Sequence, residues 1–151
     1  KLPKISLKGD AGADCYINRF KEIRADNNDN NSLKELDVDQ YVLQPLERVL
    51  CCLGFATSLP EGYYAAVVPR SGLALWKGIS IVNTPGTIDA GYRNEWAAIV
   101  VNLSNTPVTL SKNERICQLI IRKMIDYEFI ETRDLSKSSR GLGGFGSTGT
   151  K

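Results

Sequence analysis

Short runs rich in Val, Ile, Leu and Tyr alternate with Gly, Pro and Asn along nearly the whole chain. Such runs between turn residues predict β-strands, and many of them in series are typical of a sandwich or jelly roll. We therefore expect an all-β fold, a jelly-roll-like β-sandwich or barrel. Strands are expected at Lys4 to Leu7, Tyr41 to Leu43, Val49 to Leu53, Tyr63 to Val68, Ile79 to Val82, Ala97 to Leu103, Ile116 to Arg122 and Ile125 to Ile130.

Two segments depart from this pattern. The stretch from Asn18 to Asp39 is polar and carries a run of Asp and Asn residues, so we expect a solvated surface insertion. A calcium loop is an alternative, but no Glu stands at the distance that closes such a loop. The second segment, residues 140–151, is rich in glycine and is expected to be a flexible tail, or mobile lid, after one domain of residues 1–139.

Composition limits the class of partner. A chain of 151 residues is about one domain long, and its net charge of +2 gives no broad basic surface for a nucleic-acid polymer. No apolar run approaches the roughly 20 residues of a membrane span. We expect a cytoplasmic protein with a small-molecule partner and no membrane partner. Because the sequence begins with Lys1 rather than Met, we also expect a few leading residues to be missing.

The sequence contains four cysteines and no histidine. The cysteines form no C-x-x-C pair, so neither a zinc site nor Ser-His or Cys-His catalysis is expected. Any chemistry must therefore use carboxylates, Arg, Lys, hydroxyls or a metal held by oxygen. We expect reduced, buried thiols at Cys15, Cys51, Cys52 and Cys117.

The loop from Asn83 to Glu95 lies between two apolar runs and is interpreted as a hairpin loop with a Pro85-Gly86 turn. Its backbone groups could recognise the mixed donor and acceptor edge of a nucleobase. Asp89 could take a proton from water, and Tyr92 could lie against a sugar. An ordinary hairpin with a solvated Asp and Tyr is the alternative.

The motif Pro-Arg-Ser-Gly-Leu-Ala, starting at Pro69, is expected to begin the one short helix, with Ser71 near its N-cap. A phosphate could bind there, assisted by the Ser71 hydroxyl and the Arg70 guanidinium. A capped turn with Arg70 in a structural ion pair is the alternative.

Three other stretches carry candidate groups. Asp14 follows a turn of small residues, and Gln118 is a polar residue in the apolar run after Arg115. A buried polar side chain needs a partner, which neighbouring backbone could also supply. In the tail, Arg140 could pair with a terminal phosphate and Phe145 could stack on a base.

In this order, the five stretches resemble the trimeric dUTPase family, the deoxyuridine triphosphate nucleotidohydrolases. The resemblance extends from Ala11 to Gly149 and is closest at Pro-Arg-Ser-Gly-Leu-Ala and at Arg-Gly-Leu-Gly-Gly-Phe-Gly-Ser-Thr-Gly. It implies hydrolysis of dUTP to dUMP and pyrophosphate with Mg²⁺, which keeps uracil out of DNA and supplies dUMP for thymidylate synthesis. It also implies a homotrimer with active sites at subunit interfaces.

The same resemblance implies a role for each matching residue. Asp89 would activate the water that attacks the α-phosphorus, Tyr92 would stack on the deoxyribose and exclude a 2′-hydroxyl, and Asp14 would hold magnesium through water. The implied substrate-binding residues are Arg70, Ser71, Gly72 and Gln118 at the phosphates, Asn83, Gly86, Thr87 and Ile88 at the uracil, and Arg140, Phe145, Gly146, Ser147 and Thr148 in the tail.

Two other functions are considered. A dCTP deaminase shares the fold class, and a catalytically silent β-sandwich could bind nucleotide as a regulator. The complete Pro-Arg-Ser-Gly-Leu-Ala motif, Tyr92, Asp89 and the tail favour the hydrolase. The chain departs from the family pattern at Cys15, Cys117, Asn94 and Leu142, and its polar insertion has no assigned role.

Overall fold

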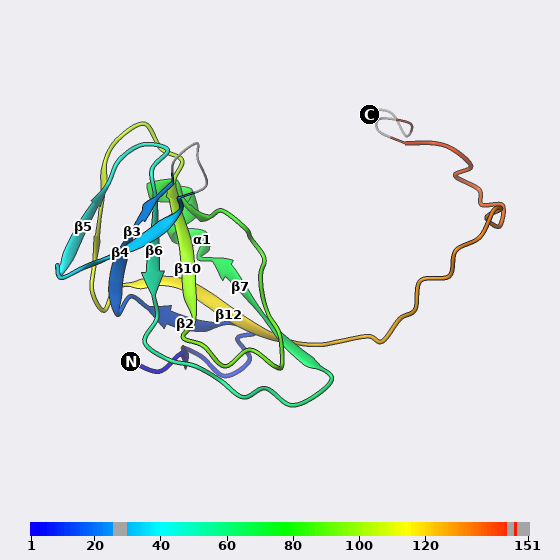
Figure 1. Cartoon of the computed structure of the whole chain (residues 1–151), viewed down its shortest axis with the longest axis horizontal. Helices are drawn as coiled ribbons and strands as arrows, with labels where there is room; N and C mark the ends of the chain where they lie inside the picture. Colours follow the sequence, from blue (N-terminus) through cyan, green and yellow to red (C-terminus); the bar gives the residue numbers. More distant parts are fainter. Residues whose placement is uncertain (26–29, 145–146, 148–151) are drawn as a thin grey trace.

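The computed structural model describes residues 1–25, 30–144 and 147, and its strands form a β-sandwich (Figure 1). One five-stranded sheet has the order β1-β2-β12-β7-β9, the other has the order β4-β3-β6-β10-β8, and β5 pairs with β11. All strand pairs are antiparallel. The elements are β1 (Lys4–Ile5), β2 (Ala13–Tyr16), β3 (Arg19–Arg24), β4 (Ser32–Leu36), β5 (Gln40–Leu43), β6 (Arg48–Cys52), β7 (Tyr63–Pro69), α1 (Ser71–Lys77), β8 (Ile79–Ile81), β9 (Gly86–Ile88), β10 (Ala97–Asn102), β11 (Val108–Ser111) and β12 (Arg115–Lys123).

The core lies between the two large sheets. Trp96, Leu43 and Val100 are fully buried, and the Trp96 ring lies 5.0 Å from the Phe55 ring, centroid to centroid. Buried residues alternate with less buried ones in the first half of β10, whereas its last three residues, Val100 to Asn102, are all buried. The predicted all-β sandwich class is confirmed. No helix among the described residues is long and apolar enough to span a membrane.

The cysteines are buried and form no disulfide, as predicted. Burial raises the pKa of the Cys51 thiol and of the Cys52 thiol above their ordinary values. The thiols therefore stay protonated at neutral pH and act as small apolar core groups rather than nucleophiles.

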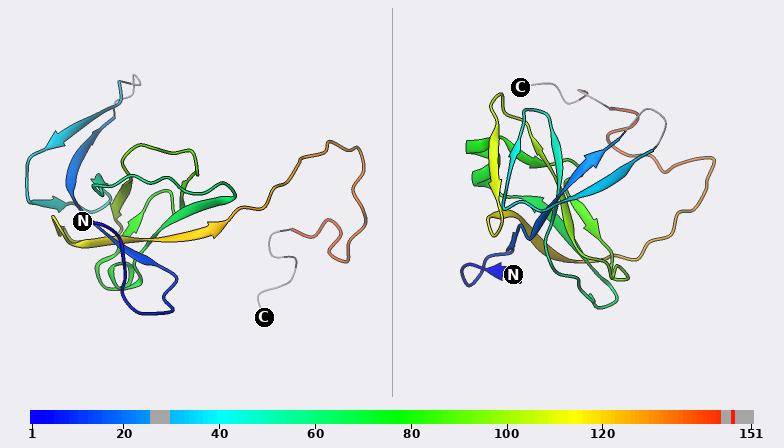
Figure 2. Two further views of the ribbon diagram at one scale, coloured as in Figure 1. Left: turned by 90° about the horizontal axis from the view of Figure 1, so that it is seen from below. Right: turned by 60° about the vertical axis from the view of Figure 1, so that its left-hand side comes forward.

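Most of the predicted strands are present, but Ile125 to Ile130 is not a strand. After β12 the chain runs away from the sandwich (Figures 1 and 2). Tyr127, Phe129 and Ile130 are 77%, 89% and 81% exposed. A strand needs a neighbour to pair with its backbone, and the described part of this single chain offers none there.

The polar insertion is also different from its prediction, because much of it is sheet. Within Asn18 to Asp39, β3 pairs with β4 on one side and with β6 on the other, and only 26–29 lie outside the described residues. Phe20 is fully buried and its ring stacks on Tyr41 at 5.8 Å. The buried Phe20 ring and the pairing with β6 therefore attach a strand in which four of the six residues are charged.

The burial of Phe20 predicts a large effect on stability. We expect Phe20→Ala to lower the free energy of unfolding by about 3 to 5 kcal/mol, because the ring leaves a cavity in the core. Leu33→Ala, in the same insertion but 53% exposed, should change it by about 0.5 kcal/mol or less. Urea denaturation followed by tryptophan fluorescence measures both values, and equal losses would show that β3 is not part of the core.

Candidate active site

The loop before β10 crosses between the two sheets. Its flanking strands, β8 and β10, are antiparallel partners as a hairpin requires. However, the loop contains β9, which pairs with β7 of the other sheet through Val67 and Gly86 and through Ala65 and Ile88. The predicted hairpin turn at Pro85-Gly86 is therefore wrong, because Gly86 begins this strand. The crossing fixes the residues after β9 at the border between the sheets.

Asp89 and Tyr92 follow β9 in a turn in which the Tyr92 amide donates to the Asp89 carbonyl at 3.1 Å. Both side chains are exposed, Tyr92 to 40%. Asp89 and Thr87 line an open pocket of about 620 Å³ together with residues of β7, β12 and the segment after β12. The remaining members of this lining are Tyr64, Lys123, Met124, Ile125 and Tyr127.

The Asn83 side chain lies beside β9 at Gly86. A Cβ at Gly86 would lie 3.4 Å from the Asn83 side-chain nitrogen and 3.6 Å from the Val67 Cβ, which are ordinary van der Waals distances. The amide of Asn83 is therefore next to the β9 backbone. The structure thus brings Asn83 and Gly86 together, on the same loop as Thr87, Ile88 and Asp89.

A second group of side chains surrounds Asp14. The Arg70 Nε donates to Asp14 Oδ1 at 2.8 Å, and the Arg115 Nη1 donates to Asp14 Oδ2 at 3.1 Å. The Asp14 side chain is only 14% exposed, so both guanidinium groups lie against a mostly buried carboxylate. We call Asp14, Arg70 and Arg115 the arginine pair site. Arg115 was not predicted as a site residue, although it stands three residues before Gln118 in an apolar strand.

Gln118 completes this region. It lies opposite Asp14 in the register of β12 and β2, and its Nε2 donates to the Pro69 carbonyl at 3.1 Å. A Cβ at Gly12 would lie 2.2 Å from the Gln118 Oε1, which is closer than real contacts allow. Gly12 is therefore a second residue that the sequence prediction missed, although it stands in the run of small residues before Asp14.

The short helix begins within the predicted motif, at Ser71, which stands next to the N-cap as expected. Arg70 is the N-cap residue, with an extended backbone, and no side chain caps the helix there. Leu73 is buried and anchors the helix to the core, while Gly78 ends it in the left-handed conformation. Ser71 and Gly72 are exposed in the first turn, next to Arg70.

The two groups lie toward opposite ends of β7. Asp89 comes after β9, whose last residue pairs with Ala65, whereas Arg70 follows the last residue of β7. At about 3.3 Å per residue, the backbones of Asp89 and Arg70 are therefore separated by about 20 Å along β7. One chain alone does not place these two residues against each other.

The described tail residues Arg140 and Ser147 are exposed, and no hydrogen bond or ion pair between described residues joins them to either group. The chain after β12 runs away from the sandwich (Figure 1). Phe145, Gly146 and Thr148 lie outside the described residues.

The described residues do not form a protein cage for a metal. They contain no cluster of three or more His, Cys, Asp or Glu side chains that could hold an ion. The Asp14 carboxylate already accepts from Arg70 and Arg115. This donor set fits Mg²⁺ only as an ion that keeps its waters and binds mainly to substrate oxygens.

The contact between Gly12 and Gln118 predicts a coupled effect. We expect Gly12→Ala to lower the free energy of unfolding by about 1 to 3 kcal/mol, because the added methyl group displaces the Gln118 amide. In a Gln118→Ala background the same change should cost much less, since the clashing group is gone. Denaturation of the four proteins of this cycle measures the coupling, and additive costs would contradict the contact.

A family model described as dUTPase matches residues 36–149. The chain is 42% identical over 149 residues to a deoxyuridine 5′-triphosphate nucleotidohydrolase of Fusobacterium nucleatum, with 99% of this chain and 90% of the relative covered. A Hydrogenobaculum protein of the same name is 50% identical over 113 residues, 75% of this chain and 78% of that relative. The solved dUTPase of Staphylococcus bacteriophage 80alpha with dUPNHPP superposes with a TM-score of 0.77 at 25% identity, over 99% of this chain and 92% of that one.

Proposed function

The chain belongs to the dUTPase family, and from this premise we propose that it hydrolyses dUTP to dUMP and pyrophosphate. The observation that carries the proposal is that the residues matching the family sort into two groups with the required chemistry. One group offers an exposed carboxylate beside an aromatic ring, and the other offers two guanidinium groups and an amide. A nucleoside triphosphate needs both kinds of group.

Asp89 is proposed as the catalytic residue that activates the attacking water. Its carboxylate is exposed, so a water molecule can reach it, and it carries the proton-accepting oxygens that a general base needs. The hydrogen bond between the Tyr92 amide and the Asp89 carbonyl holds the two residues in one turn. Tyr92 can then lie against the sugar while Asp89 faces the α-phosphorus.

Strand β9 is proposed to recognise uracil. It is the last strand of its sheet in the order β1-β2-β12-β7-β9, so β7 pairs with only one of its edges. The other edge presents N–H and C=O groups side by side, and uracil has a matching pattern of acceptors and donors. The Asn83 amide adjoins this edge at Gly86, and Thr87 and Ile88 complete it.

The arginine pair site is proposed to bind the phosphates. Asp14 accepts from the Nε of Arg70, which leaves the Nη2 of that guanidinium for a phosphate oxygen. The Arg70 guanidinium is adjoined by other candidate phosphate-binding residues, namely Arg115, Gln118, Ser71 and Gly72. The Asp14 carboxylate orients Arg70 and reduces the repulsion between the two cations. Asp14 would hold Mg²⁺ through water, and the ion would supply charge neutralisation of the phosphates when it is bound.

We propose that the complete site forms between copies of the chain, as in a homotrimer. The separation of Asp89 from Arg70 along β7 supports this, because a second copy can bring one group to the other. The segment after β12 gives independent support: its exposed Tyr127, Phe129 and Ile130 need an apolar partner surface.

The tail, with Arg140, Phe145, Gly146, Ser147 and Thr148, is proposed to close over bound nucleotide. The buried, unpaired cysteines support a reducing, cytoplasmic location.

One set of assays tests both the substrate and the role of Asp89 as the general base. We expect pyrophosphate release from dUTP in the presence of Mg²⁺, little from dCTP, dTTP or UTP, and loss of release with a chelator. Asp89→Asn should lower kcat by about a thousandfold while the affinity for a non-hydrolysable dUTP analogue changes little, because the amide cannot accept the proton. Ammonia release from dCTP would instead indicate a deaminase, and binding without turnover by the wild type would indicate a regulatory module.

The lid is tested by truncation after Lys137. The described residues among those removed belong to no strand or helix, so the thermal midpoint should stay within a few degrees of that of the full chain. The value of kcat for dUTP should fall by about a hundredfold, because closure excludes water and fixes the phosphates in line. A truncated protein with full activity would show that the tail has no part in catalysis.

A further inference from the structure

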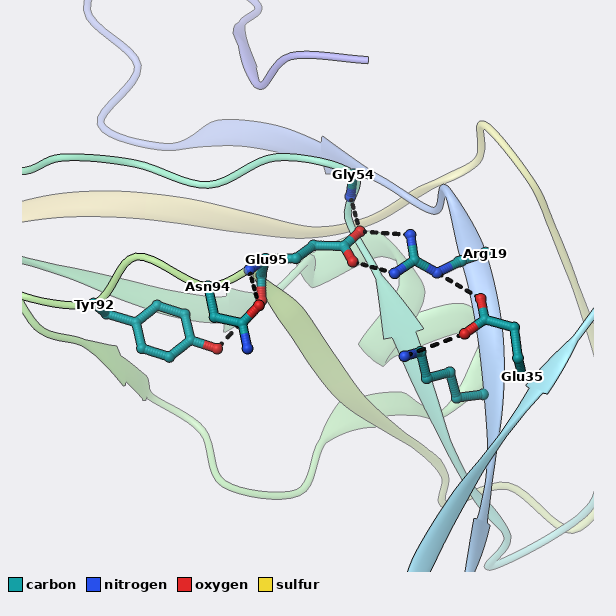
Figure 3. A network of polar contacts seen from close by, with 7 residues as sticks. Arg19, Glu35, Gly54, Tyr92, Asn94 and Glu95 are labelled. Carbon is teal, nitrogen blue, oxygen red and sulfur yellow. Dashed lines mark hydrogen bonds and ion pairs between the residues drawn. The ribbon is translucent and has the colours of Figure 1, made fainter.

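A network of ion pairs joins the inserted strands to the catalytic loop (Figure 3). Arg19, the first residue of β3, donates from Nη1 to Glu95 Oε1 at 3.1 Å, and its Nη2 pairs with Glu95 Oε2. These two parallel contacts make a fork, the arrangement in which Arg and carboxylate bind most specifically. Glu95 lies just before β10, at the end of the loop that carries Asp89 and Tyr92.

The third guanidinium nitrogen of Arg19, Nε, pairs with a carboxylate of β4, the second inserted strand. This Nε lies 2.6 Å from Glu35 Oε1 of β4, and Glu35 in turn pairs with Lys21 at 3.2 Å. The guanidinium is therefore held by a carboxylate on each side. The side chains of Arg19 and Glu95 are 34% and 24% exposed, so this pair is shielded from solvent more than ordinary surface pairs are.

Glu95 also accepts a hydrogen bond from the backbone of the loop that follows β6. The Gly54 amide donates to Glu95 Oε1 at 2.8 Å. Gly54 has φ +74°, and a Cβ there would lie 2.8 Å from the Asn18 side chain, so this position requires glycine. The Glu95 carboxylate is thus fixed by Arg19 of β3 and by the Gly54 amide from the loop after β6.

The Glu95 backbone in turn anchors Tyr92. The Tyr92 hydroxyl donates to the Glu95 carbonyl at 3.3 Å, and the Glu95 amide donates to the side-chain oxygen of Asn94 at 2.8 Å. Figure 3 shows these contacts as one chain from Glu35 through Arg19 and Glu95 to Tyr92. The position of the ring therefore depends on where the Glu95 backbone is held.

We propose that Arg19, supported by Glu35, is a positioning residue that holds Glu95 and through it the Tyr92 ring, so that the inserted hairpin β3–β4 sets discrimination between deoxyribonucleoside and ribonucleoside triphosphates. The inference rests on the proposed function, because it assigns the contact with the sugar to Tyr92. It gives the polar insertion a role that its composition does not reveal. Arg19 does not touch the nucleotide and acts only through Glu95.

The test is a double-mutant cycle that uses Arg19→Gln and Tyr92→Phe. The measured quantity is kcat/KM for dUTP divided by kcat/KM for UTP. Each single change should lower this ratio by about tenfold, because Arg19→Gln releases Glu95 and Tyr92→Phe removes the hydroxyl bonded to it. The double variant should fall little further than either single variant, since both changes break the same chain of contacts.

Two matched variants separate positioning from stability. Arg24→Gln breaks an exposed pair with Glu22 on the same strand and should leave the ratio unchanged. Arg19→Lys keeps the charge but not the fork, so it should recover only part of the ratio. A lower thermal midpoint with an unchanged ratio for Arg19→Gln, or effects that multiply in the double variant, would overturn the proposal.

Failure of the proposed function gives a different result. If the wild type releases no pyrophosphate from dUTP, the same ratio is taken from dissociation constants of the α,β-imido analogues of dUTP and UTP, measured by calorimetry. A lower ratio for Arg19→Gln, without further loss in the double variant, would then support positioning in a protein that binds but does not hydrolyse. Equal ratios in all variants, or no binding by the wild type, would overturn the inference.

Discussion

The pairing of β9 with β7 is the interaction on which the candidate active site depends. The strands on either side of the loop, β8 and β10, belong to one sheet, whereas β9 hydrogen-bonds to the other. A loop whose backbone is hydrogen-bonded to one sheet at its ends and to the other sheet through β9 has few accessible conformations. The residues after β9 are therefore fixed although they are exposed. Asp89 and Tyr92 therefore occupy a defined place without being buried, which is what a side chain needs if it is to meet both water and a ligand.

The arginine pair site depends on a different constraint, the cost of burying charge. Asp14 is mostly buried, and a buried carboxylate must be paired. Two guanidinium groups do this from positions 56 and 101 residues away along the chain. The same pairing fixes the Arg70 side chain close to the first turn of α1. Together with the Gly12 and Gln118 contact, it shows that β2, β7 and β12 serve as one rigid support for groups that would otherwise be flexible.

Much of the fold could be predicted from the sequence because apolar, largely buried runs such as β6, β7 and β10 stand between turn residues. The predictions failed where a strand is mostly polar, and where a strand-like run has no neighbouring strand in the described chain to pair with. β3 is mostly polar and is attached by its pairing with β6 and by the buried Phe20, which a composition argument overlooks. Ile125 to Ile130 has a strand-like pattern without a neighbouring strand in the described chain. In the site, the residue types were visible in the sequence, but the partners of Asp14 and Gln118 were not, because long-range contacts set them. The roles given to those residues remain predictions.

The place of Arg19 and Glu35 within the inserted hairpin has a consequence for how this region can change. Arg19 opens β3 and Glu35 is near the end of β4, so their ion pair lies at the end of the hairpin where it joins the sandwich. The contacts to Glu95 come from Arg19, at the other end of the hairpin from the pairing of Arg24 with Ser32. Residues can therefore be inserted or deleted between Arg24 and Ser32 without altering the attachment to the loop. Length variation during evolution is tolerated best at that point, and a peptide tag or reporter domain spliced in there would leave the sandwich intact.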